Sequence, residues 1–318
     1  MNSNKNQAHN KVQWLTVESE YVGQRIDNYL IRILKGVPKS YIYRILRRGE
    51  VRVNKGRIKP TYRLQMDDEL RIPPVRVSQS RTVVDGKKPD WLAERILYED
   101  KRIIVLNKPT GLAVHGGSGV QFGVIEAMRK WRDDLHYLEL VHRLDRDTSG
   151  CLILAKKRSA LRQLHEQLRE GEVQKRYLAL VEGNWSYGHK TVNAPLQKQV
   201  LRSGERMVRV SEQGKAASTS FRLLAAKKKA SLLDVELHTG RTHQIRVHSA
   251  HMGHPIAGDE KYGTDSYNRY IASLGFKRLF LHARGVSFTL QEPLDEITVN
   301  APLDQSFEDV LVKLELSF

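Results

Sequence analysis

The sequence contains a single cysteine, Cys151, among its 318 residues. One thiol cannot form an internal disulfide, and its place in an apolar run predicts a buried structural thiol in a reducing compartment, the cytoplasm. Long apolar runs are also missing, since no stretch approaches 18 consecutive apolar residues, and we expect no membrane partner. Residues 1–11 are rich in Asn and Lys and lack an apolar core. They predict a disordered tail, not a signal peptide.

Acidic residues are few relative to basic ones. The chain has 36 Asp and Glu against 53 Lys and Arg, which gives a net charge of +17. Such an excess predicts a polyanionic partner, nucleic acid first, because cations that neutralise phosphates release condensed counterions. Residues 1–84 hold 17 basic and 7 acidic residues, so +10 of the net charge lies in about a quarter of the chain.

The pattern within residues 12–75 predicts a small folded module. Apolar residues at helical spacing, Ile26, Tyr29 and Leu30 among them, predict a helix that starts near Gln24. A second helix, with Ile42, Ile45 and Leu46 facing inward, should end at Gly49. Short strands are expected around Val51–Val53 and Leu70–Ile72, with a turn at Asn54–Gly56.

Basic residues dominate part of this module. From Arg32 to Arg63 there are eleven basic residues and one acid, Glu50. A solvated helix face more often mixes both signs, so this excess favours a surface for the RNA backbone. The candidate RNA-binding residues here are Arg44, Arg47, Arg48, Arg52 and Lys55.

Residues 76–90 contain Pro, Ser, Gly and charges without periodicity, which predicts a flexible linker to a second domain, residues 91–318. That second domain alternates strands and helices, an α+β pattern with a mixed or antiparallel sheet. Its expected elements are a strand at 103–106, a helix at 124–131, a strand at 151–155, a helix at 159–169 and a hairpin at 221–237 that turns at 227–229.

Two further patterns are weaker signals. The glycines of residues 116–119 lack the Gly-Lys-Ser/Thr ending of a phosphate-binding loop and predict a mobile turn near an active-site rim. Four histidines gather near Arg246, and two of them, His248 and His251, would share a helix face at a spacing compatible with metal ligation. No Asp, Glu or Cys completes a convincing set nearby, so we expect these imidazoles to be structural or to touch RNA, and we expect no metal. The other two histidines are His243 and His254.

The most informative segment is residues 141–150, Val-His-Arg-Leu-Asp-Arg-Asp-Thr-Ser-Gly. It holds two acids, three potential cations and two hydroxyls, and the buried-looking strand at 151–155 follows at once. Taken alone, this segment fits a reactive group staged beside a core, and it fits equally a solvated loop capped by hydroxyls.

This segment resembles the H-R-L-D-x-x-T-S-G motif of the RluA family of RNA pseudouridine synthases, whose Asp is catalytic. Three further segments resemble the family's other motifs, in the same order: residues 107–115, residues 175–183, and residues 239–248 continuing to 253–256 and 258–259. The resemblance covers roughly Trp91 to the C-terminus. Residues 23–27, 47–54 and 67–70 resemble the ribosomal-protein S-four type of RNA-binding domain. The resemblance therefore implies the pseudouridine synthase catalytic fold preceded by a small S-four-like domain.

The resemblance also implies roles for single residues. Asp145 would attack or deprotonate the ribose while the base detaches, and Arg246 would be its ion-pair partner. Tyr177 would stack on the uracil and help to move a ring proton, and Ile245 would form an apolar wall. Arg143 would fill the space left by the flipped uridine. His115 and Arg241 would contact RNA, and the reaction needs no cofactor.

The target is harder to read. Residues 39–60 and the loop at 115–119 most resemble the branch that modifies uridines of bacterial 23S rRNA, so the expected partner is the 23S rRNA of the large ribosomal subunit or its precursor, bound by a monomer. The runner-up is the same reaction on tRNA or on other rRNA uridines. Two other classes stay open: a non-catalytic rRNA-binding assembly factor, and a glycosidase-like hydrolase. The hydrolase would need a second placed carboxylate, for which Asp147 is the one close candidate.

Overall fold

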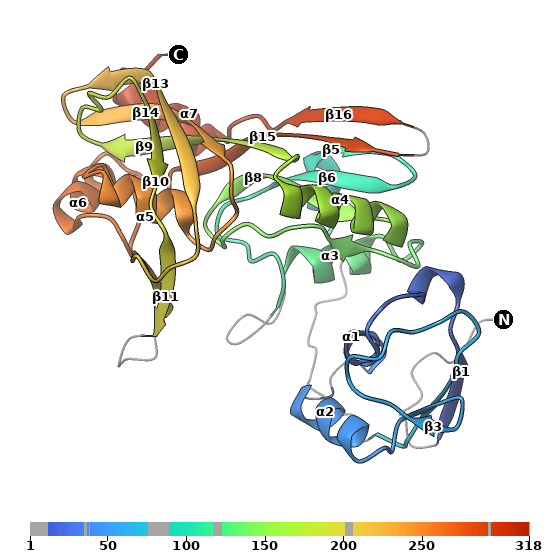
Figure 1. The fold of residues 1–318 in the computed structure, drawn as a ribbon. Helices are drawn as coiled ribbons and strands as arrows, with labels where there is room; N and C mark the ends of the chain where they lie inside the picture. The colour runs from blue at the N-terminus through green and yellow to red at the C-terminus, as the bar shows by residue number, and fades with distance from the viewer. Residues whose placement is uncertain are drawn as a thin grey trace. The chain divides into compact units, whose positions relative to one another are not determined.

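A computed structural model of the chain describes residues 12–34, 37, 39–75, 89–116, 123–200, 206–291 and 294–317. Contacts between Cα atoms divide the chain into two compact units, Met1–Lys87 and Lys88–Phe318 (Figure 1). The predicted tail, residues 1–11, and residues 76–88 of the predicted linker lie outside the described residues. Asp90, placed in the linker by the sequence, is instead the first residue of a 3₁₀ helix, η2 (Asp90–Arg95).

The smaller unit is a four-stranded antiparallel sheet with two helices on one face. The two helices confirm those predicted from the apolar stripes, and their apolar side chains share one core with the sheet. Asn54 and Lys55 have φ of 49° and 64°, the conformation of a two-residue type I′ turn, at the predicted position. The strands lie in the order β1-β4-β2-β3. The elements are β1 (Gln13–Thr16), η1 (Ser19–Tyr21), α1 (Ile26–Ile33), α2 (Lys39–Arg47), β2 (Arg52–Val53), β3 (Gly56–Arg57) and β4 (Glu69–Ile72).

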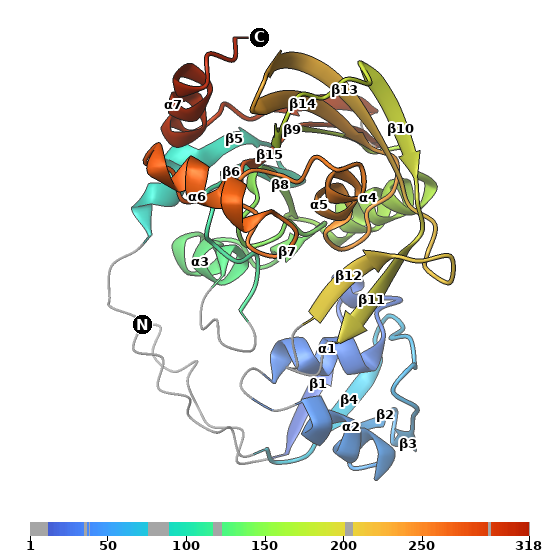
Figure 2. The ribbon, with the colours of Figure 1, turned by 90° about the vertical axis from the view of Figure 1, so that its left-hand side faces the viewer.

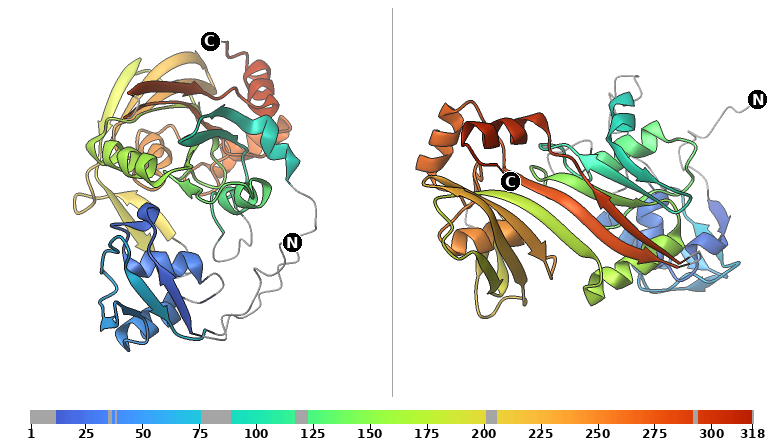
Figure 3. Two further views of the ribbon diagram at one scale, coloured as in Figure 1. Left: turned by 90° about the vertical axis from the view of Figure 1, so that its right-hand side faces the viewer. Right: turned by 90° about the horizontal axis from the view of Figure 1, so that it is seen from above.

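The larger unit is built on a ten-stranded sheet, whose long central strands are seen from above in Figure 3. Its order is β10-β13-β14-β9-β15-β8-β6-β5, with β16 on β15 and β7 on β8. Of the strand pairs that the structure describes in this sheet, only β15 with β8 is parallel, so the sheet is mixed, as predicted. The strands are β5 (Ile96–Glu99), β6 (Ile103–Lys108), β7 (Glu139–Leu140), β8 (Ser149–Ala155), β9 (Gln174–Glu182), β10 (His189–Asn193), β13 (Ser218–Lys227), β14 (Ala230–Leu237), β15 (Leu281–Leu290) and β16 (Asp295–Asn300). A separate hairpin pairs β11 (Leu196–Val200) with β12 (Arg206–Val210).

Among the described residues, five α-helices accompany this sheet: α3 (Val124–Trp131), α4 (Arg158–Glu170), α5 (Gln244–His251), α6 (Asp265–Ser273) and α7 (Gln305–Lys313). The first two and the β13–β14 hairpin confirm the elements predicted at 124–131, 159–169 and 221–237. Among the described residues, no helix has both the length and the apolar character needed to cross a membrane.

Strand β9 has a core on each of its faces because successive side chains point to opposite sides. Leu178 and Leu180 belong to a core that also contains Ile271 of α6 and Phe307 of α7, two helices that lie next to each other in Figure 2. Tyr177 and Ala179 belong to the main core on the other face. Helices α6 and α7 therefore close one face of β9, and Tyr177 points to the other.

Strand β8 fixes the position of the loop that precedes it. All seven of its residues are buried, which confirms the strand predicted at 151–155 and extends it by two residues. Gly150 has φ +105°, and a Cβ there would lie 2.2 Å from the carbonyl oxygen of Ala283. Glycine is therefore required where β15 runs against β8.

Candidate active site

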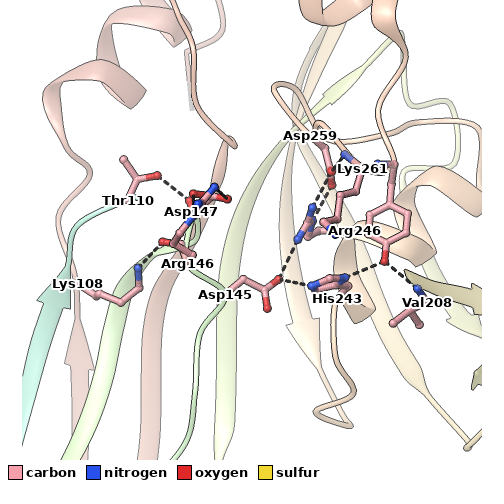
Figure 4. A network of polar contacts seen from close by, with 11 residues as sticks. Lys108, Thr110, Asp145, Arg146, Asp147, Val208, His243, Arg246, Asp259 and Lys261 are labelled. Atoms are coloured by element: carbon pink, nitrogen blue, oxygen red, sulfur yellow. Dashed lines mark hydrogen bonds and ion pairs between the residues drawn. The ribbon is translucent and has the colours of Figure 1, made fainter. Parts of the chain in front are cut away.

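Asp145 lies in the loop between β7 and β8, and a buried lysine holds this loop. The Lys108 ammonium donates hydrogen bonds to the carbonyl oxygens of Pro109 (2.8 Å), Leu112 (2.8 Å) and Arg146 (2.9 Å), and the residue is 1% exposed. Burial lowers the pKa of Lys108 to about 7, although the nearby acids favour its charge. Three carbonyl acceptors match the three protons of an ammonium group, so this residue ties the end of β6 to the loop (Figure 4).

The structure corrects the reading of His142 as a potential cation. Its Nε2 accepts a hydrogen bond from the Ile153 backbone N–H at 3.1 Å, and burial lowers its pKa to about 4. The ring is therefore neutral at pH 7 and serves as an acceptor. Arg146 pairs with Asp147 at 2.9 Å on the surface, so the carboxylate that a hydrolase would need is already engaged by its neighbour.

Helix α5 brings Arg246 to Asp145. The Arg246 Nη1 lies 3.2 Å from Oδ2 of Asp145, while its Nε and Nη2 each donate to Asp259 at 2.7 Å (Figure 4). Burial disfavours the charge on Arg246, but the hydrogen bonds to Asp259 and the fields of both acids raise its pKa. The guanidinium thus carries a permanent charge that is shared between two carboxylates, one buried and one 21% exposed to the cavity.

His243 stands on the other side of Asp145. It is the N-cap of α5 with φ 54°, an unusual conformation for a residue with a side chain. Its Nε2 lies 3.8 Å from Oδ2 of Asp145, and its Nδ1 lies 2.7 Å from the Tyr262 hydroxyl. That hydroxyl accepts a hydrogen bond from the Val208 N–H at 3.0 Å. Because the hydroxyl oxygen already accepts one N–H, we assign its proton to the bond with Nδ1, and this assignment places the imidazole proton on Nε2, toward Asp145.

A cavity of about 490 Å³ opens beside Asp145. Tyr177 and Ile245 line it and are both buried, while Arg143 is exposed at its rim. Burial raises the pKa of Tyr177, and the field of Asp145 adds to this, so the phenol keeps its proton at neutral pH. Asp145, Arg143 and Arg246 also line an adjoining hollow of about 900 Å³. Asp145 therefore lies between two hollows, with an apolar and aromatic wall on one side.

The remaining predicted RNA contacts fall in different places. Arg241 lines the cavity, and its Nε donates to the Ala216 carbonyl at 3.0 Å. His115 is exposed and lies outside the lining of both hollows, and residues 117–122 of the glycine loop are not among the described residues. In the smaller unit, Arg44, Arg47 and Arg48 are exposed on and just after α2, Arg52 is exposed on β2, and Lys55 is exposed in the I′ turn.

The four histidines near Arg246 have separate surroundings. His248 is buried and contacts the Thr219 hydroxyl and the Ala194 carbonyl, each at 2.9 Å. His254 lies 2.8 Å from the Glu182 carbonyl, and His251 is exposed. Within the described ranges, no group of three or more His, Cys, Asp or Glu side chains is arranged to hold a metal ion.

Three residues of this site had no role in the sequence-based prediction: Lys108, Tyr262 and Asp259. His243 was expected to be structural or to touch RNA, and its position beside Asp145 was not predicted. Lys108 and Asp259 fall inside motif segments, and a lysine that ends an apolar strand is itself a signal of a buried charge. Tyr262 lies outside the quoted segments and offered no signal of its contact with His243.

Residues 102–251 match the protein family described as RNA pseudouridylate synthase, and residues 24–70 match the S4 domain. The ribosomal large subunit pseudouridine synthase C of Pasteurella multocida (strain Pm70) is 57% identical over 303 residues, which cover 94% of this chain and 93% of that protein. The protein of the same name from Escherichia coli (strain K12) is 54% identical over 308 residues, which cover 95% and 97%.

A solved structure is similar as well. The human RNA pseudouridylate synthase domain containing 4 matches with a TM-score of 0.60 and 28% sequence identity, covering 72% of this chain and 96% of that chain.

Proposed function

The chain belongs to the RNA pseudouridylate synthase family, and we propose that it isomerises uridines of 23S rRNA, in the large ribosomal subunit or its precursor. Membership confirms the predicted family, the fold and the enzyme class, an isomerase. The proposed target is supported by relatives that are 52–57% identical and carry large-subunit names. We propose further that the enzyme is a cytoplasmic monomer with domains at 12–75 and 91–318.

The contact of Asp145 with Arg246 is the observation on which the proposed chemistry rests. Pseudouridine formation breaks the bond from ribose C1′ to ring nitrogen N1, joins C1′ to ring carbon C5, and moves a proton from C5 to N1. In our proposal, the Asp145 carboxylate attacks the ribose as the base detaches. The permanent positive charge of Arg246 lies 3.2 Å from that carboxylate.

Asp259 has a different task from Asp145 although both contact Arg246. Its two hydrogen bonds to the guanidinium, each at 2.7 Å, fix the orientation of the plane. Asp259 also accepts the backbone N–H groups of Lys261 and Tyr262. It is therefore a positioning residue, and Asp145 is left with one of its oxygens at the open cavity.

Tyr177 and Ile245 give the detached uracil a surface on which to turn. Both are buried side chains of the cavity wall, and a planar base can stack on the phenol. Because the pKa of Tyr177 is raised, we assign its phenol a hydrogen-bonding role in moving the ring proton, and not the role of a phenolate base.

A uridine in structured RNA must leave its stack before it can reach Asp145, at a cost of a few kcal/mol. Arg143 is exposed at the rim shared by both hollows, two residues from Asp145. We propose that its planar guanidinium occupies the vacated space and offsets part of that cost. Arg241 and the basic residues of the smaller unit would hold the RNA backbone.

Conversion of uridine in 23S rRNA tests this proposal. Purified protein is incubated with a 23S transcript and, in parallel, with total tRNA, and pseudouridine is mapped in each. Pseudouridine at discrete sites of the 23S transcript, absent with heat-inactivated protein, is the expected result. Modification of tRNA alone would move the target to the runner-up, and no pseudouridine in either RNA would overturn the proposal.

A further inference from the structure

The sheet of the smaller unit has one face that its own helices do not cover. Trp14 of β1 lies opposite Arg71 of β4, Arg71 lies opposite Arg52 of β2, and Arg52 lies opposite Arg57 of β3. These four residues form one row across all four strands, which we call the Trp14 row. Neighbouring strands are about 4.8 Å apart, so the row spans roughly 14 Å.

The direction of the row follows from its neighbours along each strand. Leu15, Leu70 and Val53, each next to a member of the row, pack in the core beneath α1 and α2. Successive side chains alternate between the faces of a sheet, so the row points to the opposite face. Trp14 is 52% exposed there, and Arg52 and Arg57 are exposed beside it.

Backbone carbonyl groups hold two of the three arginines of the Trp14 row without neutralising their charge. Like charges at directly opposed positions of a sheet repel each other, yet three arginines stand side by side. Arg71 donates to the Glu50 carbonyl at 2.9 Å and Arg52 to the Lys55 carbonyl at 3.3 Å. In the part of the chain that the structure describes, none of the three arginines pairs with a carboxylate. Glu69, opposite Thr16, is an acid on the same face.

We propose that the Trp14 row is a binding site for single-stranded RNA, with a base stacked on Trp14 and phosphates on the three arginines. Arginines alone would suit any polyanion. An exposed indole in the same row adds a platform that only an unpaired base can reach, and sites for single strands combine these two elements. The row does not include the arginines of α2, although Arg57 lies against Gly49 and Arg71 donates to the Glu50 carbonyl, just after that helix. This inference rests on the proposed function in one respect: both take RNA to be the molecule that the protein binds.

The test uses the full chain and a labelled octamer of adenylate, which contains no uridine and so offers the active site no substrate. Anisotropy gives the affinity, and tryptophan fluorescence reports stacking. Trp14→Ala should weaken binding by about tenfold and abolish part of the fluorescence quench on binding. Trp14→Phe should keep most of the affinity. Met66→Ala is the matched control, because Met66 is 55% exposed in the same unit but outside the row.

A salt series tests the arginines. Arg57→Gln and Arg71→Gln should each reduce the slope of log affinity against log salt by about 0.7, the value for one phosphate contact on a single strand. Arg162→Gln removes the same charge from the exposed surface of α4 and should leave the slope unchanged. An equal loss in all three variants would mean that only net charge matters and would overturn the site.

Other outcomes decide between occupants. Wild-type affinity in Trp14→Ala overturns the proposal, provided that its circular dichroism melt matches that of Trp14→Phe. A dimer in sedimentation that Trp14→Ala dissociates would assign this face to a second copy instead. If the protein bound an adenylate–uridylate duplex as tightly as the single strand, the proposed stacking of an unpaired base on Trp14 would be wrong. Turnover plays no part in these measurements, so failure of the 23S conversion assay and failure of the Trp14 site are separate results.

Discussion

Arg246 contacts two carboxylates, and this sharing determines what its loss should do. In Arg246→Ala, Asp145 loses its cation and the buried Asp259 loses the two hydrogen bonds from the guanidinium, so turnover should fall by at least a hundredfold even on a short unstructured oligonucleotide. Arg143→Ala should instead lose more activity on a structured stem-loop than on that oligonucleotide, because only the structured RNA needs a flipped base.

The comparison requires six values of kcat/KM: the wild-type enzyme and the two variants, each on two substrates. Equal losses of both variants on both RNAs would contradict the separate roles. A loss of Arg143→Ala on the oligonucleotide as large as on the stem-loop would count against base flipping in particular.

The Tyr262 hydroxyl sets the orientation of the imidazole that faces Asp145. Tyr262→Phe removes the bond to Nδ1 and leaves the Val208 N–H without its acceptor, so kcat should fall by about tenfold while KM changes little. Tyr270→Phe, on α6, is the matched control and should retain wild-type kcat. A loss that appears only in KM would show that Tyr262 acts on RNA binding and not on Asp145.

The sequence predicted which residues belong to the site better than it predicted the contacts between them. Asp145, Tyr177 and Arg246 came from resemblance to family motifs, and the structure places all three at one cavity. Asp259 and Tyr262 acquire their contacts only when the segment after α5 folds back onto Arg246 and His243, an arrangement with no local sequence pattern. The neutral state of His142 likewise depends on burial against β8, which its neighbours in sequence do not reveal.

Strands β8 and β15 approach each other at Gly150, and this close approach positions the loop of Asp145. Gly150→Ala should cost about 3 kcal/mol or more of unfolding free energy, since its Cβ would lie 2.2 Å from a carbonyl oxygen at a positive φ. Gly188→Ala is the matched control: Gly188 also has a positive φ, +62°, but its Cβ would meet nothing within 4 Å.

Urea unfolding of both variants measures the difference. Gly188→Ala should lower the free energy of unfolding only by the cost of placing alanine at a positive φ, about 1 to 2 kcal/mol. Equal losses would show that φ alone accounts for Gly150 and that the close approach to Ala283 is not a constraint.

Elements with a strong local period were predictable. Helices α3 and α4 follow from apolar spacing, and the buried strand β8 follows from a short continuous apolar run. The β13–β14 hairpin follows from its polar turn. Strand β1 was not predicted, because it has four residues and pairs with β4 far along the chain. The row that Trp14 forms with three arginines depends on that pairing, so it too is invisible without the register of the sheet.

We expect the larger unit to carry the chemistry and the smaller unit to add RNA affinity, and a truncated chain can test this. A chain starting at Pro89 keeps every proposed active-site residue and should still fold, because the larger unit has its own cores. It should convert uridine in a short oligonucleotide at the wild-type rate, and bind 23S rRNA with lower affinity and a shallower salt dependence, by a little under one unit of slope per lost phosphate contact.

Affinity measured across a salt series for both chains gives the answer. If the affinity of the truncated chain depended on salt as steeply as that of the full-length chain, RNA binding by the smaller unit would be contradicted. A folded but inactive truncated chain would place part of the smaller unit in the active site.

For the molecule as a whole, the net charge predicted the class of partner, and the order of the motifs predicted the family. A net charge of +17, concentrated toward the N-terminus, indicated a polyanion, and four ordered motifs indicated the family. Charge cannot distinguish one RNA from another, so the 23S target depends on similarity to named relatives.

The central claim is that the Asp145 carboxylate carries out the isomerisation, and Asp145→Asn tests it most directly. The substitution keeps the size of the side chain and leaves Arg246 its bonds to Asp259, so folding and RNA affinity should stay near wild type. Pseudouridine formation in the 23S transcript should fall at least a thousandfold, because an amide cannot serve as the nucleophile. Turnover within tenfold of wild type, by a protein with an unchanged melt and unchanged RNA affinity, would contradict the account.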